Sequence, residues 1–276
     1  MTIKIHDSNG RLLNYSKFVF SGGEIQIKLE LDLNSSLTPL FASDNTIQIT
    51  AIIHDASTII ELLLVTDALR NRYRGCKIEL DIPYFPFARQ DRVCADGEAF
   101  SLKVMCDLIN MQKYDAVYVN DVHSNVTLDL LNNSFNIPCS FFIKRKMIDN
   151  SILVSPDKGA VGRVSECARL FDKIMIVAEK VRDPNTGNIT GTKIIDFDKI
   201  TSNDFMIIDD ICDGGRTFIE LAKVLKPLTT GKIKLFVTHG IFSKGFEVFE
   251  GLIDEIYTAF SFIEEKDLPA FVHIVY

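Results

Sequence analysis

The sequence predicts an α/β protein made of two similar halves, each with a mainly parallel sheet flanked by helices. Short apolar runs of strand length alternate with segments whose apolar residues recur at helical spacing, which is typical of parallel sheets. The alternation restarts after Pro138, so we expect two domains, residues 1–140 and 141–276. Polar and glycine-rich segments follow several strands, where ligands bind in open α/β sheets.

The first half contributes the elements expected between residues 46 and 131. Runs such as KIELDI, in which apolar and polar residues alternate, predict strands. Runs such as TIIELLLVTDAL, with apolar residues three and four apart, predict amphipathic helices. We expect strands at 46–53, 77–82 and 116–120, helices at 57–73, 100–111 and 124–131, and a loop at 83–92.

The second half repeats this order with continuous apolar runs that indicate buried strands. We expect strands at 152–154, 173–178, 205–208 and 232–238, and a helix at 161–171. In FMIIDDICDGGRTF another helix is expected from Thr217 onward, because Phe218, Leu221 and Leu225 follow at helical spacing. The acids and glycines of this stretch are therefore expected on a strand-to-helix loop.

Composition limits the class of protein. The chain has 276 residues, of which 47% are hydrophobic and 24% charged, as in ordinary globular proteins. Its net charge of −7 argues against general nucleic-acid binding. No apolar run reaches the length of a membrane span, and the N-terminus lacks the apolar stretch of a secretion signal, so we expect a cytoplasmic protein. The six cysteines include no CxxC pair and are expected to be reduced thiols.

The segment DDICDGGRT predicts a site for a sugar phosphate. Its two glycines let the backbone bend and approach a ligand, and the amides at the start of the following helix would face a phosphate. Carboxylates repel phosphate, so Asp209 and Asp210 require a partner that needs acceptors, either sugar hydroxyls or Mg²⁺. The structural alternative is an acidic helix cap with glycines for the turn.

Several motifs together resemble one family. Besides DDICDGGRT, the sequence contains, in chain order, FSGGE (20–24), IPYFPFARQDR (82–92), FSLKVMCDLIN (100–110), NDVHS (120–124), VSPDKGAVGRV (154–164), EKVR (179–182) and THG (238–240). These segments resemble those of the ribose-phosphate diphosphokinases, also called phosphoribosyl-diphosphate synthetases. The resemblance spans almost the whole chain.

The resemblance implies two tandem domains of the phosphoribosyltransferase fold in a homo-oligomer, a dimer or a hexamer. It implies that ATP binds near the domain interface. It also implies transfer of the β,γ-diphosphoryl group of Mg-ATP to the 1-hydroxyl of ribose 5-phosphate, with release of AMP. The expected partners are therefore ATP and a ribose phosphate, with Mg²⁺ as cofactor and with neither nucleic acid nor a membrane.

The family's ATP-binding positions correspond to residues of two segments. Arg89, Gln90 and Asp91 lie in ARQDR, where a guanidinium suits phosphate oxygens and an amide suits an adenine edge. Phe20 and Glu24 match residues that reach the adenine of a neighbouring subunit. Between them, Gly22 replaces the usual Asp or Asn, which leaves the selectivity for adenine open. The alternative for ARQDR is a solvated polar loop.

Acceptor, metal and catalytic positions also carry over. The ribose-phosphate positions are Asp209, Asp210, Asp213, Gly214, Gly215, Arg216 and Thr217; the metal positions are His123 and Asp157; the catalytic positions are Lys180, Arg182 and His123. The two cations would stabilise charge on the transferred phosphoryl group. Turn-forming residues at 183–193 predict a mobile loop beside them. The alternatives are a helix cap for Asp157, a core or surface role for His123, and a solvated basic loop for the cations.

Departures from the family leave other functions open. The sequence has Lys-Val-Arg where Lys-Arg-Arg is common, and Asp-Gly-Gly-Arg-Thr where Asp-Thr-Ala-Gly-Thr is usual. Two glycines and an added arginine suit a larger acceptor such as ADP-ribose, which would place the protein in NAD salvage. A noncatalytic regulatory subunit of a synthetase is a further alternative. A phosphoribosyltransferase would share DDICDGGRT but has no reason to carry ARQDR.

Overall fold

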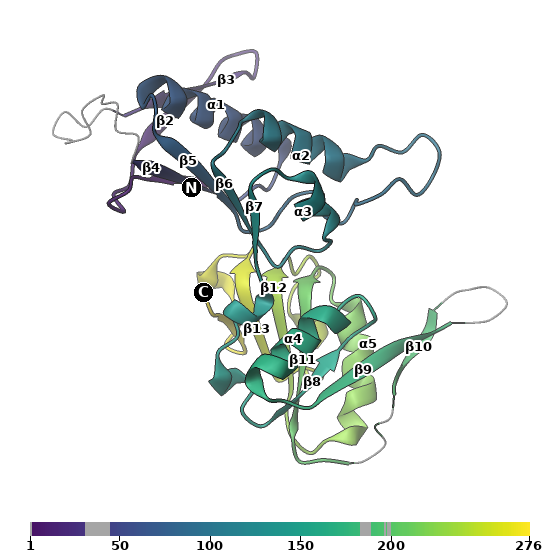
Figure 1. Ribbon diagram of the computed structural model, residues 1–276. Coiled ribbons are helices and arrows are strands. Elements are labelled where there is room, and N and C mark those ends of the chain that lie inside the picture. Colours follow the sequence, from purple (N-terminus) through teal and green to yellow (C-terminus); the bar gives the residue numbers. More distant parts are fainter. Residues whose placement is uncertain (1, 31–44, 183–188, 196, 198–199) are drawn as a thin grey trace. The chain divides into compact units, whose positions relative to one another are not determined.

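A computed structural model describes residues 2–30, 45–182, 189–195, 197 and 200–276 (Figure 1), with the backbone alone described for 180–182, 189 and 190. The chain divides into two compact units, Met1–Ile137 and Pro138–Tyr276. The domain boundary predicted between residues 140 and 141 falls inside the short 3-10 helix η1 (Cys139–Phe141). None of the described helices combines the length and hydrophobicity that a membrane crossing requires.

The first unit is built on a five-stranded sheet in the order β1-β4-β5-β6-β7. Strands β4 to β7 are parallel, and β1 joins the edge as an antiparallel strand. The bounds are β1 (Ile3–His6), β4 (Thr46–Ala51), β5 (Lys77–Ile82), β6 (Ala116–Asn120) and β7 (Ser134–Ile137). The parallel order confirms the arrangement that the strand–helix alternation predicts.

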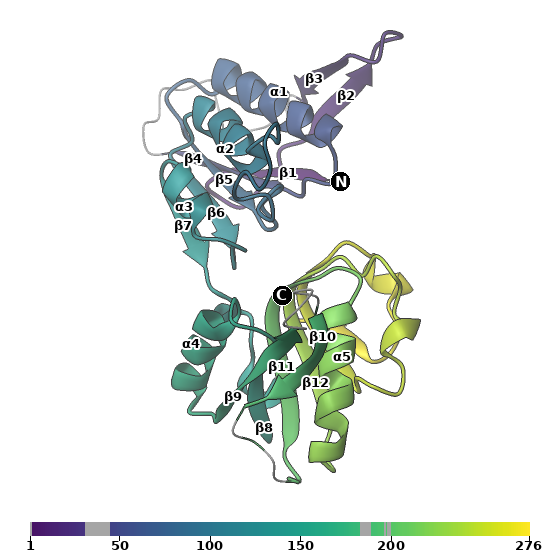
Figure 2. The same ribbon diagram turned by 90° about the vertical axis from the view of Figure 1, so that its right-hand side faces the viewer.

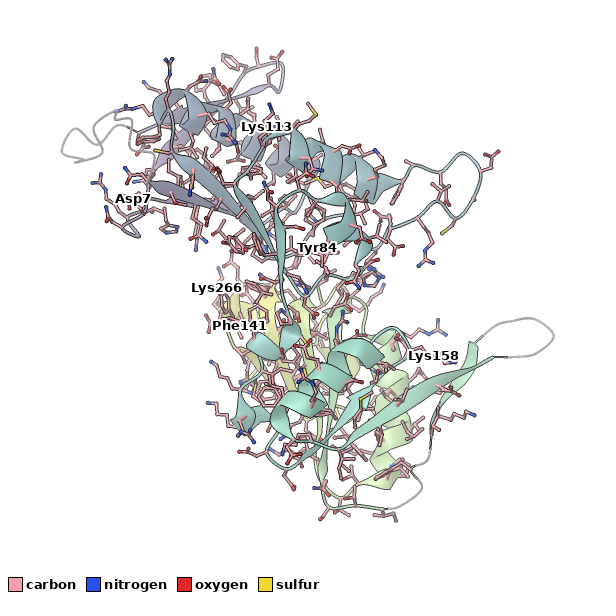
Figure 3. All side chains as sticks on the ribbon, viewed as in Figure 1. Asp7, Tyr84, Lys113, Phe141, Lys158 and Lys266 are labelled. Carbon is pink, nitrogen blue, oxygen red and sulfur yellow. The ribbon has the colours of Figure 1, made fainter. Side chains whose placement is uncertain are left out.

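The helices of the first unit are α1 (Ala56–Arg72), α2 (Ser101–Met111) and α3 (Val126–Leu130). Apolar residues of α1 and α2 share one core with alternate residues of the strands. A separate hairpin, β2 (Tyr15–Val19) and β3 (Ile25–Leu29), packs on α1 through β3. Tight turns close the strand ends: after β1, Oδ1 of Asp7 (Figure 3) accepts the backbone N–H groups of Asn9 and Arg11, each at 2.9 Å.

The second unit is built on a seven-stranded sheet in the order β10-β9-β8-β11-β12-β13-β14. All neighbouring strands are parallel except β9 and β10, which form an antiparallel pair at one edge. The bounds are β8 (Ser151–Ser155), β9 (Met175–Arg182), β10 (Ile189–Ile194), β11 (Asp204–Cys212), β12 (Ile233–Gly240), β13 (Glu255–Ser261) and β14 (Val272–Ile274).

Helices cover both faces of this sheet (Figure 2). Helix α4 (Val161–Phe171) contacts β8, β9 and β11, and α5 (Arg216–Leu225) contacts β10 and β12. Phe205 and Ile207 of β11 join the core that contains α5, whereas the alternate residue Met206 lies outside that core and is also buried. All residues of β12 are buried, as expected for a central parallel strand with both faces covered.

Several expected bounds differ from the structure. Strand β11 runs to Cys212 because its pairing with β12 continues as far as Gly240, so Asp209 and Asp210 lie on the strand and not on a loop. Helix α5 begins at Arg216, one residue early. Residues 189–193, expected in a mobile loop, pair with β9 as part of β10, and 183–188 lie outside the described residues. Strand β9 begins and ends later than expected, and α3 is shorter than the helix expected at 124–131.

Candidate active site

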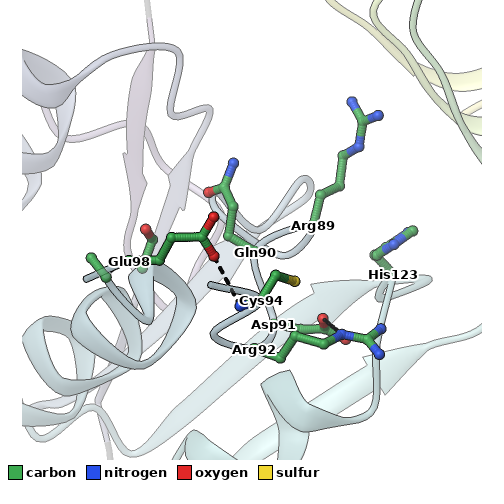
Figure 4. Close-up of a pocket in the computed structure, with 9 residues that line it drawn as sticks. Arg89, Gln90, Asp91, Arg92, Cys94, Glu98 and His123 are labelled. Atoms are coloured by element: carbon green, nitrogen blue, oxygen red, sulfur yellow. Dashed lines mark hydrogen bonds and ion pairs between the residues drawn. The ribbon is translucent and has the colours of Figure 1, made fainter. Parts of the chain in front are cut away.

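A cavity of about 640 Å³ opens at the end of β5 in the first unit (Figure 4). Its lining comes from the loop after β5, the start of α2 and the segment after β6. The residues are Arg89, Gln90, Asp91, Arg92, Cys94, Glu98, Ala99, Ser101 and His123. The structure thus brings together Arg89, Gln90 and Asp91, the three ATP-binding positions expected in this loop, with His123.

The loop after β5 is anchored at both ends. Phe85 is buried in the core of the unit, and the N–H of Leu102 in α2 donates to the backbone carbonyl of Gln90 at 3.3 Å. Between these anchors, Phe87 has a φ of 61°, a conformation that L-residues rarely adopt. The anchors hold Arg89 and Gln90 exposed on the surface of the cavity.

Charged groups of both signs meet in this cavity. Asp91 accepts a hydrogen bond from Nε of Arg92 at 3.0 Å. Burial raises the pKa of Asp91, but hydrogen bonds from Ser124 and Arg92, with the charges of Arg92 and His123, outweigh burial and lower it. Asp91 is therefore a carboxylate at neutral pH. Glu98 accepts the N–H groups of Cys94 and Ala95 and closes the turn at the other side of the loop (Figure 4).

The hairpin residues expected to serve a neighbouring subunit do not line this cavity. Phe20 and Glu24 flank the turn between β2 and β3, where the N–H of Phe20 donates to the carbonyl of Glu24 at 2.8 Å. Half of the Phe20 surface is exposed, and its ring packs edge-on against the exposed Phe18 at 5.2 Å. The tip of the hairpin therefore presents two aromatic rings to its surroundings.

In the second unit, the expected acceptor carboxylates lie at the carboxyl end of β11. Nη1 of Arg163 in α4 lies 2.8 Å from Oδ1 of Asp209 and 2.9 Å from Oδ1 of Asp210. Burial and then the charge of Asp210 raise the pKa of Asp209 well above its ordinary value, and Arg163 acts in the opposite direction. Two adjacent acids, Asp209 mostly buried and Asp210 buried, thus share one guanidinium.

The segment from Asp213 to Thr217 joins β11 to α5, and its shape depends on Gly215. Gly215 has a φ of 75°, and a Cβ there would lie 2.5 Å from the ring of Phe249, so only glycine fits without movement. Asp213 accepts a hydrogen bond from Oγ of Ser243 at 2.5 Å. Arg216 is exposed at the first position of the helix. Backbone amides of Gly215 to Thr217 lie at this helix start, as a phosphate site requires.

The remaining catalytic and metal positions are only partly described. Lys180 and Arg182 belong to β9, where they pair with Thr192 and Ile189 of β10; their side chains lie outside the described residues.

Asp157 follows β8, and its Oδ1 accepts the N–H groups of Gly159 and Ala160 at 2.9 and 3.3 Å. These bonds close the turn before α4, but the N-cap residue of that helix is Ala160 and no side chain caps it, so Asp157 is not the helix cap. The neighbouring Lys158 (Figure 3) is mostly exposed, with Nζ 3.7 Å from Glu179 of β9.

A resident metal site is not evident from the described side chains, among which no three acids, histidines or cysteines cluster as ligands. The acids at β11 are held by Arg163, and one oxygen of Asp157 is held by backbone amides. Mg²⁺ commonly binds through one or two protein carboxylates, several waters and substrate phosphates. The residues therefore fit an ion that arrives with a nucleotide better than an ion held by the protein alone.

Sequence reasoning did not single out several residues that the structure places at these sites. Arg163 is the main one: it stands three residues after Ala160 and four before Cys167, both buried, so its place on the covered face of α4 could have been read from helical spacing. Lys244 follows THGIFS, and its Cγ would lie 3.3 Å from a Cβ on Gly214. Its position depends on a loop that no local pattern predicts.

Comparisons with known proteins agree with this geometry. A family model for the N-terminal domain of ribose phosphate pyrophosphokinase matches residues 6–112, and one for the phosphoribosyl transferase domain matches residues 140–245. A ribose-phosphate pyrophosphokinase of Pyrococcus furiosus is 33% identical over 205 residues, which cover 72% of this chain and 71% of the relative. A Mycoplasmopsis pulmonis protein of the same name is 28% identical over 259 residues, with 89% and 76% covered.

A solved structure gives the same fold. The phosphoribosylpyrophosphate synthetase of Mycobacterium smegmatis superposes with a TM-score of 0.75 over 96% of this chain and 87% of the other, at 18% identity. With both domain types matched in sequence and this fold in common, the chain belongs to the ribose-phosphate pyrophosphokinase family, a family of ATP-dependent diphosphotransferases.

Proposed function

We propose that the protein transfers the β,γ-diphosphoryl group of Mg-ATP to the 1-hydroxyl of ribose 5-phosphate, giving phosphoribosyl diphosphate and AMP. A bond forms between the hydroxyl oxygen and the β-phosphorus, and the bond from the β-phosphorus to the oxygen bridging it to the α-phosphorus breaks. The hydroxyl proton passes to solvent water, and the bridging oxygen leaves on AMP. Such a reaction would supply an activated ribose for nucleotide biosynthesis.

One observation supports this proposal most strongly: a single chain retains both the cavity around Arg89 to Asp91 and the carboxylate and glycine-rich site at the end of β11. A phosphoribosyltransferase needs the second site but not the first. A diphosphoryl transfer between a nucleotide and a sugar phosphate needs both.

In the donor site, the cavity offers groups suited to ATP. The guanidiniums of Arg89 and Arg92 fit phosphate oxygens, and Gln90 carries the donor and acceptor that an adenine edge requires. Asp91, kept ionised by its neighbours, accepts from Arg92 and orients it. We assign Arg89, Gln90 and Asp91 to nucleotide binding on this basis.

In the acceptor site, the backbone amides that suit a phosphate and the carboxylates that suit hydroxyls come from different parts of the chain. The backbone at Gly214 and Gly215 and the start of α5 suit the 5-phosphate, and the carboxylates of Asp209 and Asp210 suit the ribose hydroxyls. Asp213 turns away toward Ser243, which fixes the loop between the two parts. The arrangement orients the sugar with its anomeric carbon away from the phosphate.

The transferred group gathers negative charge in the transition state, and we assign its stabilisation to Lys180 and Arg182 with His123. These positions carry over from the family motifs. Bound Mg²⁺ would neutralise charge on the phosphate oxygens. His123 and Asp157, which match the family's metal positions, are the residues that we propose would hold it. In this proposal the side chains of Lys180, Arg182 and His123 bind and orient the triphosphate.

A homo-oligomer in the cytoplasm completes this proposal, with Phe20 and Glu24 reaching the adenine bound by a neighbouring subunit. The exposed pair Phe18 and Phe20 at the hairpin tip supports it, because exposed aromatic residues are enriched at binding surfaces. A stacked ring and a carboxylate acceptor would suit the base and its amino group.

A second acceptor, ADP-ribose, is favoured by the cations around the glycine loop. Cγ of Lys244 would lie 3.3 Å from a Cβ on Gly214, and Lys244 and Arg216 are both exposed, so two cations adjoin the backbone proposed to hold the phosphate. A diphosphate bridge has more oxygens to pair than a single phosphate group. The same transfer to ADP-ribose would belong to NAD salvage.

The deciding experiment is AMP release from Mg-ATP by the purified protein, with ribose 5-phosphate and ADP-ribose compared at matched concentrations. A higher kcat/KM with ribose 5-phosphate supports the main proposal, and a higher value with ADP-ribose supports the second. Arg216→Ala should then lower the use of ADP-ribose more than that of ribose 5-phosphate, with Lys223→Ala on the same helix as control. Absence of AMP with either acceptor would contradict both and favour a noncatalytic subunit.

A further inference from the structure

Arg163 reaches from α4 to both acids at the end of β11. Its side chain is mostly buried, and one nitrogen, Nη1, lies within 2.9 Å of a carboxylate oxygen of each acid. Oδ1 of Asp209 also accepts the backbone N–H of Asp210 at 2.9 Å. This oxygen is therefore held from two directions, by a helix and by the strand itself.

The charge balance of this cluster is unusual for a buried site. Two carboxylates, 17% and 6% exposed, face one guanidinium that is 14% exposed. Burial and the charge of Asp210 raise the pKa of Asp209 and Arg163 opposes this shift, so removal of Arg163 would further favour a proton or a cation on the pair. A protonated acid loses acceptor capacity, and a bound cation would occupy the oxygens that a sugar needs.

We infer that Arg163 is a positioning residue, an inference that rests on the proposed function. Arg163 keeps Asp209 and Asp210 oriented as acceptors for the hydroxyls of the ribose phosphate. It also prevents divalent cations from binding to this pair of acids. The acids then contact the sugar directly, and Mg²⁺ stays with the nucleotide. Arg163 is assigned to act on the sugar through these two carboxylates.

A purely structural ion pair would have different properties. Buried ion pairs can often be replaced by apolar groups without loss of stability, so stability alone does not explain two acids at this point of the fold. The cluster lies at the carboxyl end of a central parallel strand, next to the loop that contains Gly214 and Gly215. Ligands of open α/β sheets bind at that edge.

The kinetic test compares Arg163→Met and Arg163→Lys with Arg169→Met, an exposed arginine on the same helix. Loss of a charged hydrogen bond costs about 1.5–3 kcal/mol, so Arg163→Met should raise the KM for ribose 5-phosphate by roughly 10- to 100-fold. The KM for ATP should stay near the wild-type value. Arg163→Lys, which keeps the charge but not the planar fork, should show an intermediate effect. Equal changes in both KM values would overturn the inference.

A binding test needs no activity. Mn²⁺ serves as a paramagnetic probe for Mg²⁺, and its binding to nucleotide-free protein is followed by electron paramagnetic resonance. Arg163→Met should bind about one more Mn²⁺ per chain than wild type or Arg169→Met, because two carboxylates are released for a cation. Adding Asp209→Asn to Arg163→Met should remove this extra site. The same Mn²⁺ stoichiometry in Arg163→Met and wild type would count against exclusion of cations by Arg163.

These readouts separate two kinds of failure. A wild-type protein that releases no AMP contradicts the proposed function, whereas the Mn²⁺ result still tests Arg163 directly. If Arg163→Met does not fold, as judged by its thermal unfolding curve, Arg163→Lys decides. Its KM for ribose 5-phosphate should rise several-fold over that of Arg169→Met, and an unchanged value would overturn the inference.

Discussion

At the scale of single residues, Gly215 shows how one missing side chain shapes the segment between β11 and α5. Its φ of 75° and the ring of Phe249 leave no room for a Cβ. Gly215→Ala should therefore lower the free energy of unfolding by about 2–4 kcal/mol, the sum of left-handed backbone strain and overpacking. Urea denaturation of the purified variant measures this loss.

Gly251→Ala is the matched control for this prediction. Gly251 has a φ of 72°, but nothing lies within 4 Å of a Cβ built there, so only the backbone contribution of about 1–2 kcal/mol should be lost. The difference between the two variants isolates the contact with Phe249. Equal losses in both would mean that the ring moves aside without cost.

Asp81 predicts a pH dependence of stability. Burial raises the pKa of this acid on β5 from 3.8 to about 6, and among the described residues its Oδ1 has no hydrogen-bond partner. Between these two pH values the folded chain binds a proton that the unfolded chain releases, so stability falls as pH rises from about 4 to about 6. The free energy of unfolding should fall by about 1–3 kcal/mol over this range in wild type. Asp81→Asn should remove this change in unfolding curves recorded at the same pH values. A variant that keeps the slope of wild type would exclude Asp81 as its source.

At the scale of elements, the sequence predicts most strands and helices because both periodicities are strong. The predicted ends of strands and helices are wrong where pairing between strands outweighs the local preferences of the residues. The acids Asp209 and Asp210 signal a loop when taken alone, yet β12 supplies hydrogen-bond partners as far as Gly240 and keeps them in the strand. Likewise, the turn formers at residues 189–193 join β10 because β9 pairs with them. Strand β12 follows β11 only after α5, whereas β9 directly precedes β10 in the chain.

The β2–β3 hairpin is fixed to α1 by one buried acid. Oε1 of Glu61 accepts the hydroxyl of Tyr15 at 2.8 Å, and Oε2 lies 2.7 Å from Nζ of Lys17. Glu61→Ala should cost about 2–3 kcal/mol, because it leaves a buried hydroxyl without this acceptor and a cation without this partner. Hydrogen exchange should also quicken across residues 15–29.

Two further variants test whether Glu61 acts through these bonds. Glu61→Gln keeps an acceptor for Tyr15 and should lose less stability than Glu61→Ala. Asp67→Ala, at an exposed position of the same helix, should change stability little. Protection of the hairpin that is unaltered in Glu61→Ala would show that contacts between β3 and α1 hold it without the acid.

At the scale of the whole molecule, two separate cores explain why the tandem organisation could be predicted. Each unit has its own cluster of buried apolar residues, which is consistent with a separate alternation of strands and helices in each half. Residues of one contiguous motif, such as Arg89 to Asp91, could also be expected to lie together, and they line one cavity. The partners of Arg163 and Ser243 could not be predicted, because each residue meets its partner only after helices and loops distant in sequence have packed.

The assembly itself can be tested by mixing defective subunits. Suppose that Phe20 contacts the nucleotide bound by a neighbouring subunit, while Lys180 acts in the site of its own subunit. A chain with Phe20→Ala and Glu24→Ala then impairs only the site of its neighbour. A chain with Lys180→Ala impairs only its own site. Lys180→Ala alone should lower kcat by orders of magnitude with little change in folding. Co-expressed in equal amounts, the two chains should form intact sites at about a quarter of positions.

Activity at low ATP concentration measures this recovery. Mixing Lys180→Ala with Arg182→Ala is the matched control: both lesions fall on the same segment of one chain, so no combination of these subunits contains an intact site. Recovery in the first mixture and none in the second would place the hairpin of one subunit at the nucleotide of another. If the first mixture stays as inactive as the second although both chains are present in the same oligomers, Phe20 and Glu24 serve their own subunit. The exposure of Phe20, which lies outside the cavity lined by Arg89 and Gln90, leads us to expect recovery.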